Sequence, residues 1–402
     1  MAILRRSISG AFDAPAPSSE VQRGHTAPLP IGCDIALVRT AGDLEALAGP
    51  WKRLEQQATG GHHIFQSHDW LMAWAETYAP RLVIAAGRRN GELAFAWPLM
   101  QIRVGPVKIL RWLAEPHSQY GDVLAAPGEC PRMWAAAALE QLVRDSKADV
   151  IRLRHVREDA LVAPYLDTAF RRSNMDDRAP SLDLTVFADE AAYEARYTSA
   201  QRKRRKKIRK ALEETFGPLR YEIVEDGPAG SAVIATILAE KSRWVDDRGR
   251  HNRILSCPVL RDFLDRLAAR DEAGLIVSQL SAGAQPVSWD IGLRHNGIHF
   301  CFITAHVNAL TDFSPARLHM DFSQRQALRD GMKTFDLMVP DDPYKDSWCS
   351  GRTPTHDYHL PLTAVGKLYG TGYLENLRPV LREAYHHAPP AMLKLLKPVM
   401  GH

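Results

Sequence analysis

Residues 274–304, GLIVSQLSAGAQPVSWDIGLRHNGIHFCFIT, decide the fold class of this chain. Apolar and polar side chains alternate along the stretch, which predicts strands, and turns at Gly283 and at Asn296-Gly297 connect three of them. Residues 315–331 then predict a helix and residues 333–339 a last apolar strand. Strands that lead into a helix and a further strand predict a mixed sheet covered by helices, the α/β class.

The first half of the chain repeats this order of elements. Residues 81–100 predict two strands joined by an Asn-Gly turn, and residues 132–156 predict a helix followed by an apolar strand. The sequence therefore predicts two similar units in tandem, with a mixed sheet in each. The expected division is a disordered leader at 1–32, an N-terminal α/β unit at 33–185, a basic connecting helix with the C-terminal α/β unit at 186–375, and a helical tail at 376–402.

Composition narrows the class of protein. The chain has 402 residues, 45% apolar and 24% charged, as expected for a folded protein of about two domains. Its net charge of +4 is too low for a general nucleic-acid binder, so no nucleic-acid partner is expected. The five cysteines lack the spacing of a zinc site, and no signal peptide or membrane span is present in the sequence. These features predict a cytoplasmic protein with reduced thiols and no metal.

The helix expected after residue 314 begins with a pattern that suits an anion. The residues DFSPARLH at 312–319 place Ser314 at the N-cap and Pro315 at the first helical position. The backbone N–H groups of Ala316 and Arg317 are then expected at the positive end of the helix, where phosphate binds well. The guanidinium of Arg317 adds a second phosphate contact. An ordinary capped helix is the alternative.

A basic run, SAQRKRRKKIRKAL at 199–212, lies on the helix expected to join the two units, and eight of the nine residues at 202–210 are Lys or Arg. One interpretation is a solvated face that pairs with Glu213 and Glu214. A second is a site for a phosphorylated ligand, held by Arg204 and Arg205. A peripheral membrane contact is a third, although the apolar stripe is thin. A nucleic-acid site is disfavoured because the run contains no aromatic residue.

Several segments together resemble a known family. They are FQSHDWLMAW at 65–74, the basic helix running into LEETFGPLRYEIVE at 212–225, the RW of EKSRW at 240–244, and FSPARLHMDFSQRQALRDGMKTFDLMVPDDPYKDSW at 313–348. Their order resembles the CelD-like branch of the GNAT acyltransferases, which is associated with cellulose and other exopolysaccharide synthesis and is distantly related to the FemAB peptidyltransferases. The resemblance covers residues 34–370.

The resemblance implies an N-acyltransferase that moves an acyl group, expected to be acetyl from acetyl-CoA, to a sugar or a lipid-linked saccharide precursor. Such a reaction needs a cradle for the pyrophosphate, a donor to the carbonyl oxygen and a base. The start of the late helix supplies the cradle, with Ser314, Ala316 and Arg317. A backbone amide at Thr304 or Ala305 supplies the donor.

The remaining site residues are expected to contact the reacting groups or the acceptor. Catalytic roles are expected at Asp290, Asp336, Tyr344 and Lys345, and substrate contacts at Trp70, Tyr120, Arg204, Arg205, Arg243 and Trp348. Each has a structural alternative. Asp336 also fits an ion pair with Lys345 or Arg243, and Trp70 fits the core.

Two further functions remain open at this point. Ala316 stands where the family usually has Gly, which together with the basic run suits an inactive GNAT-fold regulator that binds a phosphorylated ligand such as cyclic di-GMP. The tandem units also suit a FemAB-like aminoacyl transferase.

Overall fold

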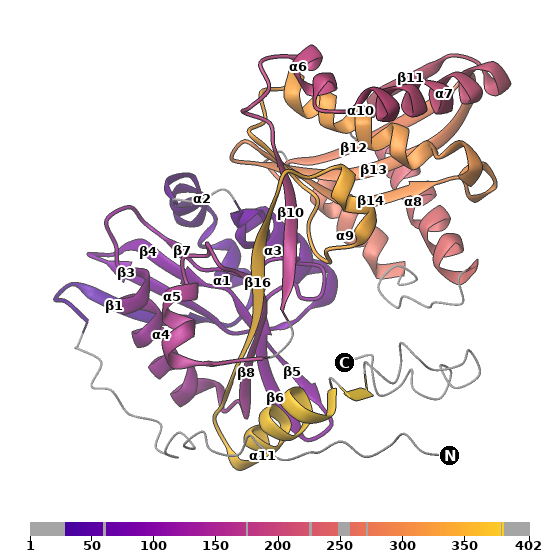
Figure 1. Ribbon diagram of the computed structural model, residues 1–402. Coiled ribbons are helices and arrows are strands. Elements are labelled where there is room, and N and C mark those ends of the chain that lie inside the picture. The colour runs from indigo at the N-terminus through magenta and orange to yellow at the C-terminus, as the bar shows by residue number, and fades with distance from the viewer. Residues whose placement is uncertain are drawn as a thin grey trace, which may run out of the picture.

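The computed structural model describes residues 29–58, 62–173, 176–224, 227–247, 258–270, 272–378 and 380–381 (Figure 1). The expected leader, except for residues 29–32, and most of the expected tail lie outside the described residues. Two α/β units follow each other along the chain, and the long strands β10 and β16 run between them through the middle of the molecule (Figure 1).

The N-terminal unit contains most of the short strands. Its elements are β1 (Cys33–Val38), α1 (Ala41–Glu45), α2 (Ala48–Gln57), the 3-10 helix η1 (His63–Gln66), α3 (His68–Tyr78), β2 (Arg81–Leu82), β3 (Ile84–Arg89), β4 (Glu92–Trp97), β5 (Leu99–Val104), β6 (Val107–Trp112), β7 (Leu124–Ala125), α4 (Pro131–Ser146), β8 (Val150–Arg157), α5 (Ala163–Ala169), β9 (Arg171–Arg172) and β10 (Asp177–Asp183).

The C-terminal unit contains the long hairpins. Its elements are α6 (Glu190–Ala195), α7 (Ser199–Phe216), β11 (Leu219–Val224), α8 (Pro228–Asp247), α9 (Pro258–Ala268), β12 (Leu275–Ala282), β13 (Gln285–His295), β14 (Ile298–His306), the 3-10 helix η2 (Asn308–Phe313), α10 (Pro315–Arg329), β15 (Thr334–Asp336) and the 3-10 helix η3 (Pro343–Ser347). The chain then returns to the N-terminal unit, where β16 (Gly351–Pro361) pairs with β8 and where α11 (Ala364–Lys367) and the π-helix η4 (Leu368–Leu377) pack against the sheet (Figure 1).

The predicted mixed α/β fold is confirmed, but the sheets are not divided between the units as expected. A four-stranded sheet, β1-β3-β4-β7, belongs to the N-terminal unit. A twelve-stranded sheet has the order β11-β12-β13-β14-β15-β10-β16-β8-β6-β5-β2, with β9 beside β16, and so crosses both units. The expectation of a separate sheet in each unit was wrong because β16 returns to pair with β8 of the first unit.

The two Asn-Gly turns have the backbone that the sequence requires. Asn90 and Asn296 have φ of 51° and 47°, and the glycines after them, Gly91 and Gly297, have φ of 86° and 77°. Positive φ at both central residues is the condition for the tight hairpin turn whose twist matches that of its strands. The turns therefore fix the pairing of β3 with β4 and of β13 with β14.

The basic helix α7 is held in place by its start and by one apolar stripe. Thr198 and Gln201 form a capping box, in which the Thr198 hydroxyl accepts from Gln201 N at 3.2 Å and the Gln201 side chain accepts from Thr198 N at 2.8 Å. Ile208, Leu212 and Phe216, four residues apart, pack against the sheet. This stripe is used by the fold. None of the described helices is long and apolar enough to cross a membrane.

One core joins the two units. Trp70 of α3 is fully buried and meets Phe263 of α9 edge to face, with ring centroids 4.9 Å apart, and Phe302 of β14 at 5.6 Å. Aromatic pairs of this kind contribute about 0.5–1.5 kcal/mol beyond their buried area. Trp70 is therefore part of the packing between the units, which was the structural alternative.

Glu55 at the end of this core makes stability depend on pH. Burial raises the pKa of Glu55 to about 7, although its carboxylate accepts a bond from His68 N at 3.1 Å. A folded-state pKa above the unfolded one stabilises the fold below the unfolded pKa, and that contribution is lost as pH rises to about 7. We expect Glu55→Gln to stabilise the protein relative to the wild type at pH 8, by on the order of 1–3 kcal/mol, and not at pH 4.5. Urea denaturation at both pH values measures this difference, and an equal effect at both would contradict it.

Candidate active site

The site begins where two parallel strands separate. β14 and β15 pair in parallel through residues 298–300 of β14 and 334–336 of β15. Beyond this point β14 continues to His306, while the chain after β15 turns toward β10, where Leu337 N donates to Pro180 O at 2.9 Å. Residues 301–306 of β14 therefore pair with β13 along one edge. Along the other edge, no described strand pairs with them.

This separation distinguishes the two amides that the sequence left open. Val307 N donates to Val287 O at 3.1 Å, so the Val307 amide points to β13. Successive N–H groups of a strand point to opposite edges, which directs the amide of Ala305 to β13 and that of Thr304 to the open edge. Ala305 is buried and its carbonyl accepts from the Ser288 hydroxyl at 2.9 Å. Thr304 is thus the better placed donor to a ligand carbonyl.

A pocket of about 450 Å³, which we call the inner pocket, lies at this edge between β13, β14, α10 and η3. Six residues expected at the site from the sequence line it: Asp290, Thr304, Ala316, Arg317, Tyr344 and Trp348. The first and last of these residues, at positions 290 and 348, are 58 residues apart along the chain, and the fold brings all six to one cavity. The inner pocket is therefore the candidate reaction site.

Asp290 is the carboxylate of the inner pocket. It lies on β13 opposite Thr304 and is only 2% exposed. The thiol of Cys301 lies 3.7 Å from one carboxylate oxygen and His299 Nε2 lies 3.9 Å from the other. These long contacts leave the carboxylate able to accept a stronger hydrogen bond from a ligand in the pocket.

A buried histidine faces Asp290 from α10. His319 is 3% exposed, and its Nε2 lies 2.9 Å from the hydroxyl of Ser278 on β12. Burial lowers the pKa of His319 to about 4, against the opposing charge of Asp290. The imidazole is therefore neutral at pH 7, so that Asp290 faces a polar but uncharged wall.

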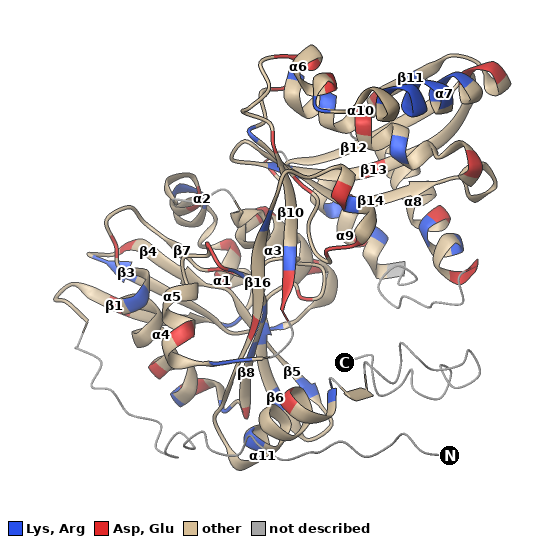
Figure 2. Ribbon diagram, in the orientation of Figure 1, with Lys and Arg blue, Asp and Glu red and all other residues tan. Residues whose placement is uncertain are grey.

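A second pocket of about 630 Å³, which we call the basic pocket, shares Arg317 and Trp348 with the first. It lies between α7 and the start of α10, and its other lining residues are Tyr197, Gln201, Arg204, Arg205, Ile208, Leu318 and Ser347. Figure 2 shows the blue run of α7 beside α10. The two pockets adjoin: the inner pocket contains the carboxylate of Asp290, and the basic pocket is lined by Arg204, Arg205 and Arg317.

The start of α10 differs in detail from the sequence prediction. Ser314 occupies the N-cap position, but its backbone is left-handed, with φ of 49°, and its side chain makes no capping bond. Arg317 N donates to Ser314 O at 3.0 Å, so this amide is already used within the turn. Ala316, which lines the inner pocket, supplies the amide at the helix end. The expected capping role of Ser314 and the free amide of Arg317 were wrong, because a tight turn precedes the helix.

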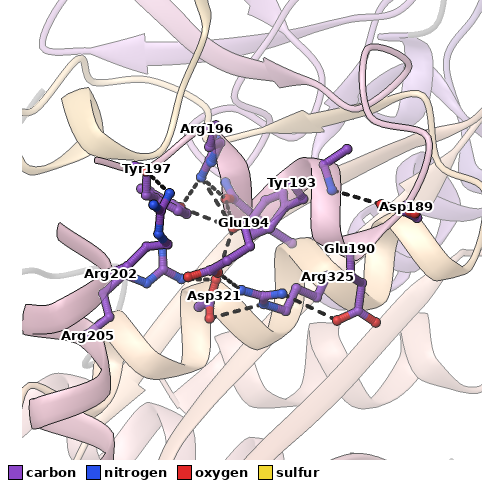
Figure 3. A network of polar contacts seen from close by, with 12 residues as sticks. Asp189, Glu190, Tyr193, Glu194, Arg196, Tyr197, Arg202, Arg205, Asp321 and Arg325 are labelled. Atoms are coloured by element: carbon purple, nitrogen blue, oxygen red, sulfur yellow. Dashed lines mark hydrogen bonds and ion pairs between the residues drawn. The ribbon is translucent and has the colours of Figure 1, made fainter. Parts of the chain in front are cut away.

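A network of aromatic and charged side chains fixes α7 against α10 (Figure 3). Arg205 stacks over the ring of Tyr197 at 3.8 Å and pairs with Asp321 of α10. Asp321 also binds Arg325 at 3.2 Å, which itself contacts Glu190 of α6 at 3.4 Å. The charge of Arg205 is therefore balanced within the protein, and its role is to position the helix.

Arg204 and Arg317 keep their charge for a ligand. Arg204 is exposed at the rim of the basic pocket. Burial, followed by the charges of Arg204 and Arg205, lowers the pKa of Arg317. Most other basic residues of α7 are exposed, and two pair with acids one turn on, Arg209 with Glu213 at 2.9 Å and Lys210 with Glu214 at 3.4 Å. The helix thus combines a solvated face with a positive edge at the pocket.

Asp336 is not brought to the pockets. It is fully buried on β15, where it accepts from the Tyr120 hydroxyl at 2.8 Å and from Met338 N at 2.7 Å, with Arg157 of β8 at 3.4 Å. Burial acts to raise the pKa of Asp336, but its contact with His62 and the charge of Arg157 outweigh burial and hold the pKa below its usual range. The ion pair expected with Lys345 or Arg243 was wrong; Asp336 ties the two units together.

The other expected residues also have structural partners. Lys345 is buried, and its ammonium donates to Met338 O at 2.7 Å and Pro340 O at 2.6 Å. Tyr120 is 2% exposed and is used by Asp336. Arg243 lies on α8 and pairs with Glu240 at 2.7 Å. Neither inner nor basic pocket is lined by these residues, by Trp70 or by Ala305.

The sequence analysis missed several lining residues of the inner pocket: Ser288, Trp289, His319, Met320 and Ser323. Three of them continue one face of α10 from Ala316, at steps of three and four residues. That helical spacing was a usable signal. On β13, Ser288 lies two residues before Asp290 and therefore on the same face of the strand, which was also a usable signal, whereas Trp289 gave none.

One segment of the C-terminal half of the chain matches a known domain family. Residues 199–346 match the family described as "Acetyltransferase (GNAT) domain". This segment begins with α7 and ends in η3, so it contains most of the residues that line both pockets, while Tyr197, Ser347 and Trp348 lie just outside it. No curated protein sequence matches the chain.

Solved structures resemble the whole chain. The match to FemX covers 84% of this chain and 99% of the FemX chain, at 11% identity and a TM-score of 0.57. A conserved protein of unknown function from Bacteroides thetaiotaomicron VPI-5482 covers 81% and 100%, at 11% identity and a TM-score of 0.51. A tandem GNAT protein from the clavulanic acid biosynthesis pathway covers 82% and 99%, at 12% identity and a TM-score of 0.47. The first two show that the fold of both units recurs together.

Proposed function

We propose that the chain is an acyltransferase, that acyl-CoA binds across the two pockets and that its acyl group passes to an amine, because residues 199–346 match the GNAT acetyltransferase domain. The observation that carries the proposal is the open edge of β14 beside Asp290, continuous with the basic pocket through Arg317 and Trp348. Acetyl is the proposed acyl group. The proposed acceptor is an amino sugar of an exopolysaccharide or of its lipid-linked precursor, on the strength of the CelD-like resemblance.

The basic pocket suits the phosphates of the cosubstrate. Arg204 and Arg317 offer guanidinium forks in the basic pocket, and the amide of Ala316 at the positive end of α10 lies in the adjoining inner pocket. The family usually has Gly at this position. Ala316 itself still lines the inner pocket, so its methyl group does not remove its backbone amide from the site. A phosphorylated regulator such as cyclic di-GMP would meet the same charges and would therefore compete with acyl-CoA.

The inner pocket suits the chemistry. The thioester supplies an activated carbonyl carbon, and the amide of Thr304 donates to its oxygen as negative charge develops there. Asp290 accepts the proton that the attacking amine loses as the new C–N bond forms. Tyr344, which lines the same pocket, holds a phenolic proton at neutral pH and donates it to the sulfur as the C–S bond breaks.

The proposal is tested by measuring release of free thiol from a panel of acyl-CoAs with amino sugars as acceptors, followed by mass spectrometry of the product. Acetyl transfer to the amine is the expected result. Binding of acyl-CoA without turnover would favour the regulator, and turnover only with an aminoacyl donor would favour a FemAB-like transferase.

The contribution of the basic pocket can be measured separately. We expect Arg204→Ala to weaken the affinity for acetyl-CoA by about 10–100-fold, since a hydrogen bond to a charged group contributes about 1.5–3 kcal/mol. Lys210→Ala, a change of the same charge on the exposed side of α7, is the matched control and should leave the Kd unchanged. Calorimetric titration compares them, and equal affinities would remove α7 from the site.

A further inference from the structure

A cluster of arginines lies on the sheet of the N-terminal unit, away from both pockets. In the parallel pair β6 and β8, Leu110 lies beside Ile151, and both pack in the core on the α4 side. Since side chains alternate, Arg111 and Arg152, one residue further on, lie together on the opposite face. Arg154 follows two residues later on that face.

The π-helix η4 and β16 bring further groups to this face. Tyr369 of η4 lies with its hydroxyl 3.5 Å from the Arg152 guanidinium, the outer limit of a hydrogen bond. Arg378, directly after η4, lies 3.9 Å from Asp357 of β16. Arg111, Arg152, Arg154 and Arg378 form what we call the arginine cluster.

The carboxylates found at the arginine cluster are too few to balance it. Among the described residues, Arg154 contacts Glu115 at 3.6 Å and Asp357 at 3.4 Å, and Asp357 is shared with Arg378. Glu375, the next acid, is held by His359 at 3.0 Å and Arg171 at 3.7 Å. Four guanidinium groups therefore face two carboxylates.

The cluster is also buried and incompletely hydrogen-bonded. Arg152 is 7% exposed, and the side chains of Arg154 and Arg378 are 26% and 17% exposed. The Nε of Arg111 is buried and has no hydrogen-bond partner among the described residues. A buried donor without a partner costs about 1–3 kcal/mol, and more when it is charged. Such an arrangement is expected where a ligand completes the bonding.

The like charges affect one another. Burial, and then the charges of Arg152 and Arg154, lowers the pKa of Arg378 to about 10. The pKa of Arg111 is lowered by burial and by the same two neighbours, although Glu115 opposes the effect. Like-charge crowding of this kind destabilises the fold.

We propose that the arginine cluster is an anion site for a phosphate group, either free or carried on a sugar or nucleotide. Guanidinium forks match phosphate oxygens in pairs, and Arg111 Nε and the Tyr369 hydroxyl provide two further donors. The site is on the N-terminal unit and does not depend on the proposed acyl transfer. It gives this unit a ligand of its own.

The experiment uses the full chain carrying Arg204→Ala, so that the basic pocket contributes less. Thermal unfolding is followed at constant ionic strength with sodium chloride, inorganic phosphate, glucosamine 1-phosphate or uridine diphosphate. We expect at least one phosphate arm to raise the apparent Tm by about 2 °C or more over chloride. The arm with the largest shift identifies how the phosphate is carried.

Variants assign the shift to the cluster. Arg152→Gln should abolish it and should be at least as stable as its parent in chloride, because a repulsive charge is removed. Arg171→Gln, an exposed arginine of β9 on the neighbouring edge, is the control and should keep the shift. If Arg152→Gln does not fold, Arg378→Gln makes the same test at a more exposed position. No shift in any phosphate arm, or a shift that survives in both cluster variants, would overturn the proposal.

Discussion

Replacing Asp290 by Asn is expected to lower kcat by about 10²–10⁴-fold, the range of general acid–base catalysis. The substitution keeps the shape of the side chain and removes its capacity to accept a proton. Asp290 is buried and its nearest described polar contacts, Cys301 and His299, lie at 3.7 Å and 3.9 Å, so the variant loses little bonding within the protein. The affinity for acyl-CoA should therefore change little.

Steady-state kinetics with calorimetry separates these two effects. Asp312→Asn, an exposed aspartate of η2 close to the start of α10, is the matched control and should retain full activity. A variant Asp290→Asn that keeps its kcat would exclude this carboxylate as the base. A loss of kcat with an equal loss of affinity would assign it to binding instead.

Asp336→Asn is expected to lower the free energy of unfolding by about 3 kcal/mol, because it breaks a fully buried charge pair. Arg157 would lose its contact at 3.4 Å, although Asp159 still holds it at 2.8 Å, and the bond from the Tyr120 hydroxyl would weaken. The effect falls on the junction of β15 with β8 and β10, so it should appear as loss of stability rather than of chemistry.

The same carboxylate predicts a direction with pH. Its folded pKa lies below the usual value, so its contribution is fully present above the unfolded pKa and is lost as pH falls through the folded one. The difference between wild type and Asp336→Asn in urea denaturation should be constant from pH 5 to pH 8 and should shrink below about pH 4. Asp342→Asn, an exposed neighbour, should have no such effect. An Asp336 variant as stable as the wild type would contradict the account of the junction.

The sequence predicted the elements that depend on interactions between residues close together in the chain. The alternation at 274–304 corresponds to β12, β13 and β14, the two Asn-Gly turns join β3 to β4 and β13 to β14, and the periodic segment after Pro315 is α10. The basic run lies on a helix, α7, as expected. Each of these features is determined by neighbours within a few residues.

The return of β16 had no local signal. In β16, His359 pairs with Arg152 and Arg352 pairs with Pro180. These residues are far apart in the sequence, so no local pattern predicts that they pair. The partners of Asp336 follow from the same crossing, because Arg157 lies on β8 and Asp336 on β15. Residue type alone suggested Lys345, which is near in sequence but is bound to backbone carbonyls.

The candidate site was predictable where a motif and a helix start coincide. Arg317 lies at the α10 start, Tyr344 and Trp348 lie in the motif that follows the last apolar strand, and the three meet at the inner pocket. The acceptor residues expected in the first unit, Trp70 and Tyr120, belong instead to packing and to the Asp336 contact. A large aromatic residue such as Trp70 in a helix is more often part of the core than of a binding site, and Trp70 is fully buried.

The central claim is that acyl-CoA occupies the separation of β14 and β15 and the basic pocket of the C-terminal unit. Hydrogen exchange with and without acetyl-CoA, read by mass spectrometry of peptides, tests it most directly. The account predicts slower exchange in peptides covering 301–323 and 199–209, and no change in β1, β3 and β4. Protection confined to residues 62–173, or none anywhere under saturating acetyl-CoA, would contradict it.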